Sequence, residues 1–485
     1  MLPSLSIPAE GRPRAVLVGI QLPEYSTEQV ESSLDELARL CKTLGLDPVA
    51  RITQRRPSTG AAMALGAGKV RELARLTGGE GVVPSPVPSH RRGSSGDGKP
   101  DEVDTSTEST LLVESEERKI DEVDREDDEQ DEVGDDSEGE KERAEVVVFD
   151  HDLTPTQLRN LEGATGARVL DRSTVILHIF QRHARSREAR IQVEIASLKY
   201  LTPRLRATGG GARDRQQGGI GVRGGAGESA LELDRRRVRD RIAELEKELV
   251  SLAREASGRR ERRGARTVSL VGYTNAGKST LMRALTGADV LVDDRLFATL
   301  DTTVRALHPE PVPRVLISDT VGFVDRLPHD LVASFRSTLA EAREAELMLH
   351  VVDAADPLYL ERLAVTRRVL AELGAGEQPE LLVLSKADRL DALQREALAA
   401  VHPEAIVVSA RSEYDVAALH GQIVAWLERA MVEASLFVPY RTPRLLHVIH
   451  ERARVLSETH EADGTRVTVR APATVIEELQ AVVAG

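Results

Sequence analysis

The chain of 485 residues is 41% hydrophobic, which is enough for buried cores in roughly three domains, and its formal net charge is −14. Because no apolar run approaches the ~18 residues that span a membrane and the first residues lack a signal-peptide layout, we expect a cytoplasmic protein. The single cysteine, Cys41, excludes an internal disulfide and a cysteine-ligated metal cluster, and we interpret it as a small buried core residue.

The N-terminal region is predicted to form an α/β domain around a small parallel sheet. Residues 14–20 (RAVLVGI) and 145–150 (EVVVFD) are apolar enough for buried strands, and residues 26–46 place apolar side chains on one helical face. This alternation of strands and helices favours a parallel sheet. We assign residues 1–78 and 144–180 to this domain.

The segment GAGKV at residues 66–70 is similar to the end of a phosphate-binding loop. However, Met63 stands where the first glycine of such a loop belongs, and Val70 replaces its hydroxyl residue. We therefore interpret this segment as a turn that opens a helix.

An acidic insertion is predicted to interrupt the N-terminal domain at residues 79–143. The stretch from Asp101 to Glu140 holds 20 acidic and 3 basic residues, so the negative charge of the chain belongs to this segment. Its composition cannot bury enough apolar surface to fold alone, which predicts disorder. We interpret the insertion as a solvated spacer, and the alternative is an acidic docking segment or a mimic of a nucleic-acid backbone.

A basic helical hairpin is predicted at residues 181–265. Apolar residues recur at helical spacing over 191–205 and in a strict 4-3-4-3 pattern over 238–252, which indicates two packed helices. Residues 181–263 hold 21 basic and 12 acidic residues, and the glycine-rich tip at 207–228 has no aromatic residue. This charge suits a phosphate backbone, through contacts with RNA shape and backbone rather than base stacking. A solvated helix face with a linker is the alternative.

The most specific motif is a phosphate-binding loop within VSLVGYTNAGKSTL, residues 268–281. Its pattern is matched by Gly272, Gly277, Lys278 and Ser279. The motif follows a β-branched strand and opens a helix, and a chance match in this chain is on the order of one in a hundred. Backbone N–H groups near Gly277 would hold the β-phosphate, Lys278 would neutralise the β- and γ-phosphate oxygens, and Ser279 would bind Mg²⁺.

Two later segments complete the pattern of a nucleotide hydrolase. The predicted strand RVLISDT ends near Asp319, which would hold Mg²⁺ through water, and Gly322 would donate a backbone N–H to the γ-phosphate. In FATLDTT, residues 297–303, the Thr299 hydroxyl would bind Mg²⁺ only while the γ-phosphate is present. We therefore predict that this segment is a switch.

Two short motifs, SKAD at 385–388 and SAR at 409–411, favour guanine as the base. The Asp388 carboxylate would accept two hydrogen bonds from guanine N1 and N2, which adenine cannot offer. The SAR segment would place a backbone amide near the guanine O6. Each motif is weak alone, but in series with the phosphate loop they predict GTP rather than ATP.

Together, the segments GGIGVRGGAGESALELDRRRVRDRI, GYTNAGKSTL, FATLD, DTVGFVDRLP, DRSTVILHIF and IQVEIASLKY resemble the HflX family of translation-associated GTPases. The resemblance runs from about residue 14 to the C-terminus, outside the acidic insertion. It implies a monomeric GTP hydrolase whose hairpin contacts RNA of the large ribosomal subunit, in ribosome splitting or rescue under stress or in ribosome biogenesis. The alternatives are a non-catalytic, nucleotide-dependent assembly scaffold and a GTPase acting on tRNA.

Three positions depart from the usual family pattern. Ser385 replaces the asparagine of the guanine-reading motif, and a serine can replace only part of its bridging to the phosphate loop. Gly225 replaces a proline in the tip, and His178 replaces an acidic residue before the hairpin. None of the three removes a predicted phosphate or magnesium ligand.

Phe323 follows the DxxG motif, where hydrolases often place a polar residue that orients the attacking water. A phenyl ring cannot orient water, so another group must do so. Two candidates are Asn275, as a ligand of a monovalent cation such as K⁺, and the ribosome, which would order the switch. We therefore expect hydrolysis that is slow alone and stimulated by the ribosome, with Phe323 packing beneath the switch.

The sequence thus predicts an α/β multidomain protein with a doubly wound P-loop GTPase domain at 266–434 and a small α+β domain at 435–485. The predicted catalytic residues are Lys278, Asn275, Thr299 and Gly322, and the predicted metal ligands are Ser279 and Thr299. The predicted nucleotide-binding residues are Gly272, Tyr273, Thr274, Asn275, Ala276, Gly277, Lys278, Ser279, Phe297, Ala298, Thr299, Leu300, Asp301, Asp319, Thr320, Val321, Gly322, Ser385, Lys386, Ala387, Asp388, Ser409, Ala410 and Arg411.

Overall fold

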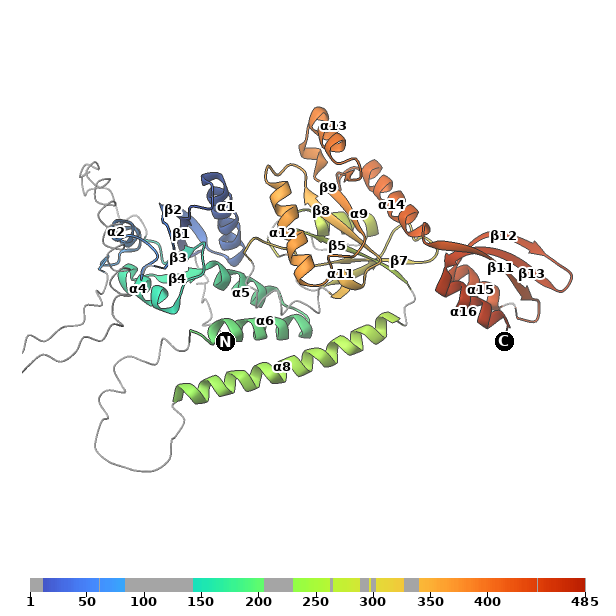
Figure 1. Ribbon diagram of the computed structural model, residues 1–485, viewed down its shortest axis with the longest axis horizontal. Coiled ribbons are helices and arrows are strands. Elements are labelled where there is room, and N and C mark those ends of the chain that lie inside the picture. The colour runs from blue at the N-terminus through green and yellow to red at the C-terminus, as the bar shows by residue number, and fades with distance from the viewer. Residues whose placement is uncertain are drawn as a thin grey trace, which may run out of the picture. The chain divides into compact units, whose positions relative to one another are not determined.

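The computed structural model in Figure 1 describes residues 12–60, 62–82, 143–204, 230–261, 265–287, 296–297, 302–326, 340–442 and 444–484. The described residues divide into two compact units, and the main division along the chain falls between Ile176 and Leu177. Apart from its two ends, the predicted acidic insertion lies outside the described residues, as does the glycine-rich tip at 207–228.

The N-terminal unit contains the predicted parallel sheet, in the order β2-β1-β3-β4. Its strands are β1 (Arg14–Gln21), β2 (Asp47–Arg55), β3 (Val146–Phe149) and β4 (Arg168–Asp171). The helices that follow them are α1 (Thr27–Leu44), α2 (Ala67–Thr77), α4 (Pro155–Thr165) and α5 (Arg172–His183), of which α5 continues into the second unit. Gly66 is the N-cap of α2, which confirms the interpretation of GAGKV as the opening of a helix.

Buried charges join α1, β3 and the start of α5. The Arg172 guanidinium forms ion pairs with Glu36 and with Asp150, at 2.7 Å from the latter, and all three side chains are buried. A buried cation requires such partners, because desolvation without them is costly. Cys41 is fully buried nearby, and its burial raises the pKa of its thiol to about 12, so the interpretation of a core residue is confirmed.

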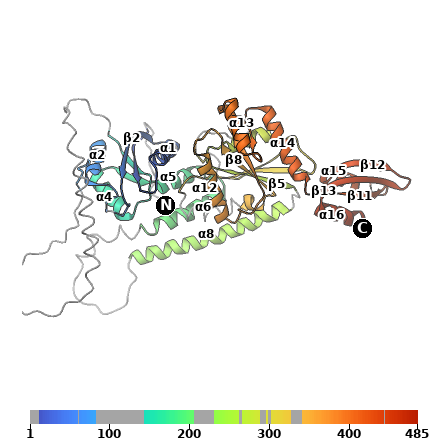
Figure 2. The same ribbon diagram turned by 45° about the horizontal axis from the view of Figure 1, so that its top comes forward.

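Two packed helices follow, as the spacing predicts. They are α6 (Arg187–Leu201) and α8 (Ala230–Glu261), which run side by side in opposite directions in both views (Figure 1 and Figure 2). Ile191 and Ile195 of α6 pack against Leu245 of α8. Ion pairs flank this seam, among them Arg241 with Glu194 at 2.9 Å. The apolar seam and these ion pairs therefore hold the two helices against each other.

The third region is a six-stranded sheet in the order β10-β9-β8-β5-β7-β6, parallel except for β6. The strands are β5 (Arg266–Gly272), β6 (Thr303–Ala306), β7 (Val315–Asp319), β8 (Leu347–Asp353), β9 (Glu380–Ser385) and β10 (Ile406–Val407). The helices are α9 (Lys278–Thr286), α11 (Ala340–Glu344), α12 (Tyr359–Glu372), α13 (Ala392–Val401) and α14 (Glu413–Glu428), with a 3-10 turn, η1 (Ala387–Arg389). The predicted α/β multidomain fold class is confirmed.

The chain ends in a three-stranded antiparallel sheet, in the order β11-β13-β12, with two helices. The elements are β11 (Met431–Pro439), α15 (Arg444–Arg452), β12 (Arg454–His460), β13 (Gly464–Pro472) and α16 (Ala473–Ala484). Apolar side chains of the strands, including Val467 and Val469, pack against Ile449 and Leu479 of the helices. Of the helices within the described ranges, none is both long and apolar enough to cross a membrane.

Candidate nucleotide-binding site

The phosphate loop connects β5 to α9, as predicted. Gly272 has φ 148°, and a Cβ there would lie 2.1 Å from the carbonyl oxygen of Val351, so only glycine fits this turn. Asn275 also has positive φ, 58°, a conformation that asparagine tolerates better than most residues. Gly277 is the N-cap of α9, so the first N–H groups of this helix point toward the loop, where an anion would be stabilised.

Lys278 lies buried at the centre of this loop. Its Nζ donates hydrogen bonds to the carbonyl oxygens of Gly272 at 3.0 Å and Tyr273 at 2.9 Å. Burial lowers the pKa of Lys278 to about 8, Asp319 acts in the opposite direction, and the positive charge of Lys386 lowers it further. A phosphate beside this ammonium would favour its charged form.

We therefore expect the protein to take up a proton when it binds nucleotide at a pH above 8. Below pH 7 Lys278 is already protonated and no uptake is expected, whereas above pH 8 the affinity should fall by up to about tenfold per pH unit. Calorimetric titration with GTP at pH 8.5, in two buffers of different ionisation enthalpy, measures the uptake. A Lys278→Arg variant is the control, since its guanidinium stays charged; equal uptake by both proteins would exclude Lys278 as the source.

Ser279, a predicted magnesium ligand, lies beside Asp319, which was predicted to hold Mg²⁺ through water. The Ser279 hydroxyl donates to Oδ2 of Asp319 at 2.7 Å, and Asp319 is fully buried at the end of β7. A hydroxyl and a carboxylate are hard oxygen donors of the kind that Mg²⁺ prefers, so this pair fits the ion. Thr299 lies outside the described residues, as do Ala298, Leu300 and Asp301.

Phe297, at the start of the predicted switch, is described and buried. Its φ is 58°, unusual for a bulky residue, and its ring lies edge-on to that of Phe180 of α5, with the ring centroids 4.5 Å apart. The side chain of Phe297 is therefore packed in the interior, and its role in nucleotide binding stays a prediction.

The DxxG segment is joined to the phosphate loop by backbone hydrogen bonds. The Phe323 N–H donates to the Gly272 carbonyl at 3.2 Å, and the Thr274 N–H donates to the Phe323 carbonyl at 2.7 Å. Phe323 is 3% exposed, which confirms that its side chain packs in the interior. A Cβ on Gly322 would lie 2.9 Å from the backbone Cα of Thr274, so glycine is required for the close approach of the two loops.

The residues that we predict to read guanine lie close together. Oδ1 of Asp388 accepts from the Ser409 hydroxyl at 2.8 Å, and Oδ2 lies 3.4 Å from Nη1 of Arg411. Burial raises the pKa of the Asp388 carboxyl, but the Ser409 hydrogen bond and the cationic groups of Arg411 and Arg389 outweigh it, so the pKa is lowered. Asp388 is therefore an anion that can accept hydrogen bonds from a base.

Two residues that the sequence did not single out support this loop. Asp353, at the end of β8, forms an ion pair with Lys386 at 2.8 Å, and Asp415 of α14 accepts from the Ser409 N–H at 2.8 Å. Asp353 follows a buried strand just as Asp319 does, so the same reasoning could have identified it. Asp415 lies in the first turn of a helix, a position where aspartate ordinarily stabilises the helix itself, so its role had no distinct signal.

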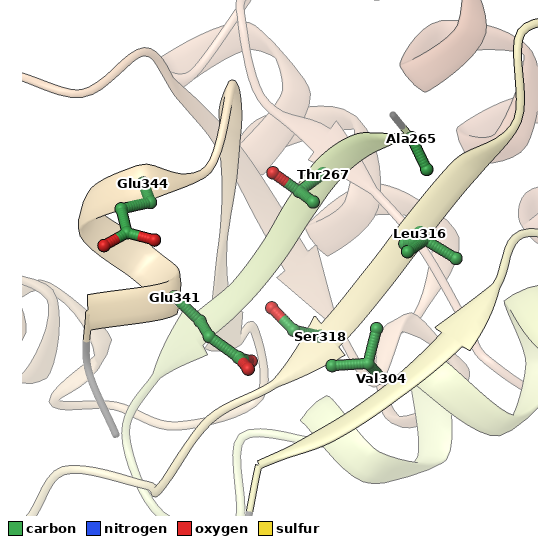
Figure 3. Close-up of a pocket in the computed structure, with 7 residues that line it drawn as sticks. All are labelled: Ala265, Thr267, Val304, Leu316, Ser318, Glu341 and Glu344. Carbon is green, nitrogen blue, oxygen red and sulfur yellow. The ribbon is translucent and has the colours of Figure 1, made fainter. Parts of the chain in front are cut away.

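A small hollow lies elsewhere on this sheet (Figure 3). It is lined by Ala265, Thr267, Val304, Leu316, Ser318, Glu341 and Glu344. Figure 3 shows the two glutamates on α11, across from side chains of the sheet. Carboxylates repel phosphate, and none of the predicted nucleotide-binding residues that the structure describes lines this hollow, so it is distinct from the described part of the candidate site.

Comparison with known proteins gives matches along most of the chain. A family model described as GTP-binding GTPase N-terminal matches residues 31–83 and 131–181. The model for the GTP-binding GTPase Middle Region matches residues 183–263, and one described as 50S ribosome-binding GTPase matches residues 267–386.

Individual proteins are similar over longer stretches. GTPase HflX of Gluconacetobacter diazotrophicus is 52% identical over 476 residues, which cover 96% of this chain and 97% of that protein. GTPase HflX of Escherichia coli is 41% identical over 335 residues, 68% of this chain and 78% of that protein. Among solved structures, the SsGBP and GDP complex is 19% identical, covers 86% of this chain and 98% of its own, and has a TM-score of 0.43.

Proposed function

Because this chain belongs to the HflX family of GTPases, we propose that it acts on the large ribosomal subunit, in ribosome splitting or rescue under stress or in ribosome biogenesis. The chain is a GTP hydrolase, as its relatives and the match to a GTPase family model show. What we propose beyond this activity is that the large ribosomal subunit is the partner to which hydrolysis is coupled. The match to a model described as 50S ribosome-binding GTPase supports it.

The observation that carries the proposal is the basic helical hairpin, which we assign to residues 181–265. Helix α8 exposes several arginines on its surface, namely Arg236, Arg237, Arg239 and Arg241, while its apolar seam is packed against α6. This cluster of arginines near the start of α8 suits the phosphate backbone of ribosomal RNA, because each neutralised phosphate releases counterions.

The test is phosphate release during multiple turnovers, with purified large subunits, purified tRNA or no addition. We expect large subunits alone to raise the rate. Stimulation by tRNA and not by large subunits would support the alternative of a GTPase acting on tRNA, and no stimulation by either would contradict the proposal.

Residues of the candidate site are proposed to act as follows. Lys278 and the N–H groups at the start of α9 bind the β- and γ-phosphate oxygens, and Gly322 donates its N–H to the γ-phosphate. Mg²⁺, when bound, supplies positive charge at these oxygens, and Ser279, Asp319 and Thr299 would hold it. Asp388 selects guanine. Because the side chain of Phe323 is apolar and packed in the interior, other groups must position the attacking water.

We propose that Asn275 is one of those groups, through a K⁺ ion held beside the phosphates. Asn275 belongs to the phosphate loop itself, has positive φ and is exposed. A cation there would stabilise negative charge that develops in the transition state. Hydrolysis by the parent protein is therefore expected to run about tenfold faster in K⁺ than in Na⁺ at equal ionic strength.

Truncation of Asn275 tests this cation effect. Asn275→Gly is the appropriate variant, because glycine accepts the positive φ without the strain that alanine would add. We expect equal rates in the two salts for this variant. A parent protein that hydrolyses GTP equally fast in K⁺ and Na⁺ would exclude the cation.

We further propose that the protein is a cytoplasmic monomer. The candidate site is built from residues of one chain, so no second copy is required to complete it.

A further inference from the structure

The guanine-reading loop has a hydroxyl at Ser385, where its motif usually has a carboxamide. Ser385 is the last residue of β9 and is 3% exposed. Its Oγ lies 2.5 Å from the carbonyl oxygen of Ala276 in the phosphate loop and 3.0 Å from that of Val352 in β8. The hydroxyl therefore joins two strands and the phosphate loop.

The number of donor protons on residue 385 determines whether its side chain can also bind the base. A serine hydroxyl has one proton to donate, whereas an asparagine carboxamide has two. Among the described residues, the Ser385 hydroxyl has two hydrogen-bond acceptors, and both are backbone carbonyl oxygens. The proton is thus used within the protein, while an asparagine could bond Ala276 and still donate its second proton to a ligand.

The loop is held in place without a carboxamide. Lys386 forms its ion pair with Asp353 at 2.8 Å, and the Ala387 N–H donates to the Val408 carbonyl at 3.2 Å. Asp388 retains the hydrogen bond from Ser409. Asp388 can therefore still bind the pyrimidine edge of guanine. What position 385 lacks is a hydrogen-bond donor for an acceptor on the other ring of the base.

The acceptor on that ring of guanine is N7. We propose that Ser385 leaves N7 unread, so that this chain selects GTP through the pyrimidine edge and O6, and binds and releases guanine nucleotides as a weak, rapidly exchanging site. The substrate class extends accordingly to guanine nucleotides altered at position 7.

The experiment compares GTP with 7-deaza-GTP, in which a C–H group replaces N7. Dissociation constants and dissociation rates are measured for the parent protein, for Ser385→Asn and for Ser385→Ala. We expect the parent to bind the two nucleotides within a factor of two. Ser385→Asn should bind GTP about fivefold more tightly than the parent and release it more slowly, and should bind 7-deaza-GTP about fivefold less tightly than GTP.

Ser385→Ala is the matched control, because it removes the bridge to the phosphate loop and adds no donor. It should weaken the binding of both nucleotides by the same factor. A parent protein that prefers GTP to 7-deaza-GTP by fivefold or more would overturn the proposal, even if Ser385→Asn did not fold. A folded Ser385→Asn variant that failed to distinguish the two nucleotides would overturn it as well.

These measurements use the protein alone. Their outcome is therefore independent of whether the large ribosomal subunit is the partner.

Discussion

Replacing Asp388 with asparagine is expected to lower the affinity for GTP by about 100-fold and to make xanthosine triphosphate the preferred ligand. The Asp388 carboxylate is ionised and accepts hydrogen bonds, so it complements the two donors on the pyrimidine edge of guanine. An asparagine amide presents a donor in place of one acceptor, which leaves one donor of guanine without a partner. The expected loss of affinity is large because two hydrogen bonds to a charged group are affected.

Titration with GTP and xanthosine triphosphate measures this change. Asp391→Asn is the matched control, because Asp391 lies three residues further on and serves as the N-cap of α13. It should leave both affinities unchanged. If Asp388→Asn retained the parent affinity for GTP, Asp388 would not be the residue that reads the base.

The second large effect concerns the hairpin. Reversing the charge of Arg235, Arg236 and Arg237 in α8 to glutamate is expected to weaken binding to large subunits by about 100-fold or more at low salt. It should also reduce the slope of log affinity against log salt by about three, since each lost phosphate contact removes about one unit. Sedimentation with purified large subunits across a salt series gives both quantities.

A control variant with the same change of net charge distinguishes the effect of the hairpin on binding from the effect of the protein's net charge. Arg368, Arg429 and Arg441 are exposed and lie outside the hairpin. Their reversal to glutamate should leave the slope close to that of the parent. An equal loss of affinity in both variants would show that general electrostatics, and not the hairpin, determines binding.

The elements that position the site could be predicted because their signals are local. A buried strand, a glycine turn and a helix start follow one another within VSLVGYTNAGKSTL, and β5, the loop and α9 form there. Asp319 was identified by its place at the end of a buried strand, and Asp388 by the SKAD motif, in which Ser385 ends β9 and Asp388 lies in η1. The seam of the hairpin also followed from periodicity alone, because apolar spacing reports which helix face is buried.

Contacts between distant segments could not be predicted in this way. The ion pair of Arg172 with Glu36 joins residues far apart in the sequence, and a charged residue at the start of a helix ordinarily lies in solvent. The Ser385 bridge is a similar case. The sequence showed that a carboxamide was missing, but only the fold showed that the hydroxyl bonds Ala276 and Val352.

The measurement that tests the central claim most directly is phosphate release by the parent and by a variant whose residues 209–227 are replaced by a short neutral linker. Both proteins are assayed with and without purified large subunits. We predict equal basal hydrolysis, because the predicted nucleotide-binding residues lie outside the replaced segment, and stimulation by large subunits for the parent only. Equal stimulation of both proteins would contradict the claim that the hairpin couples GTP hydrolysis to the large subunit.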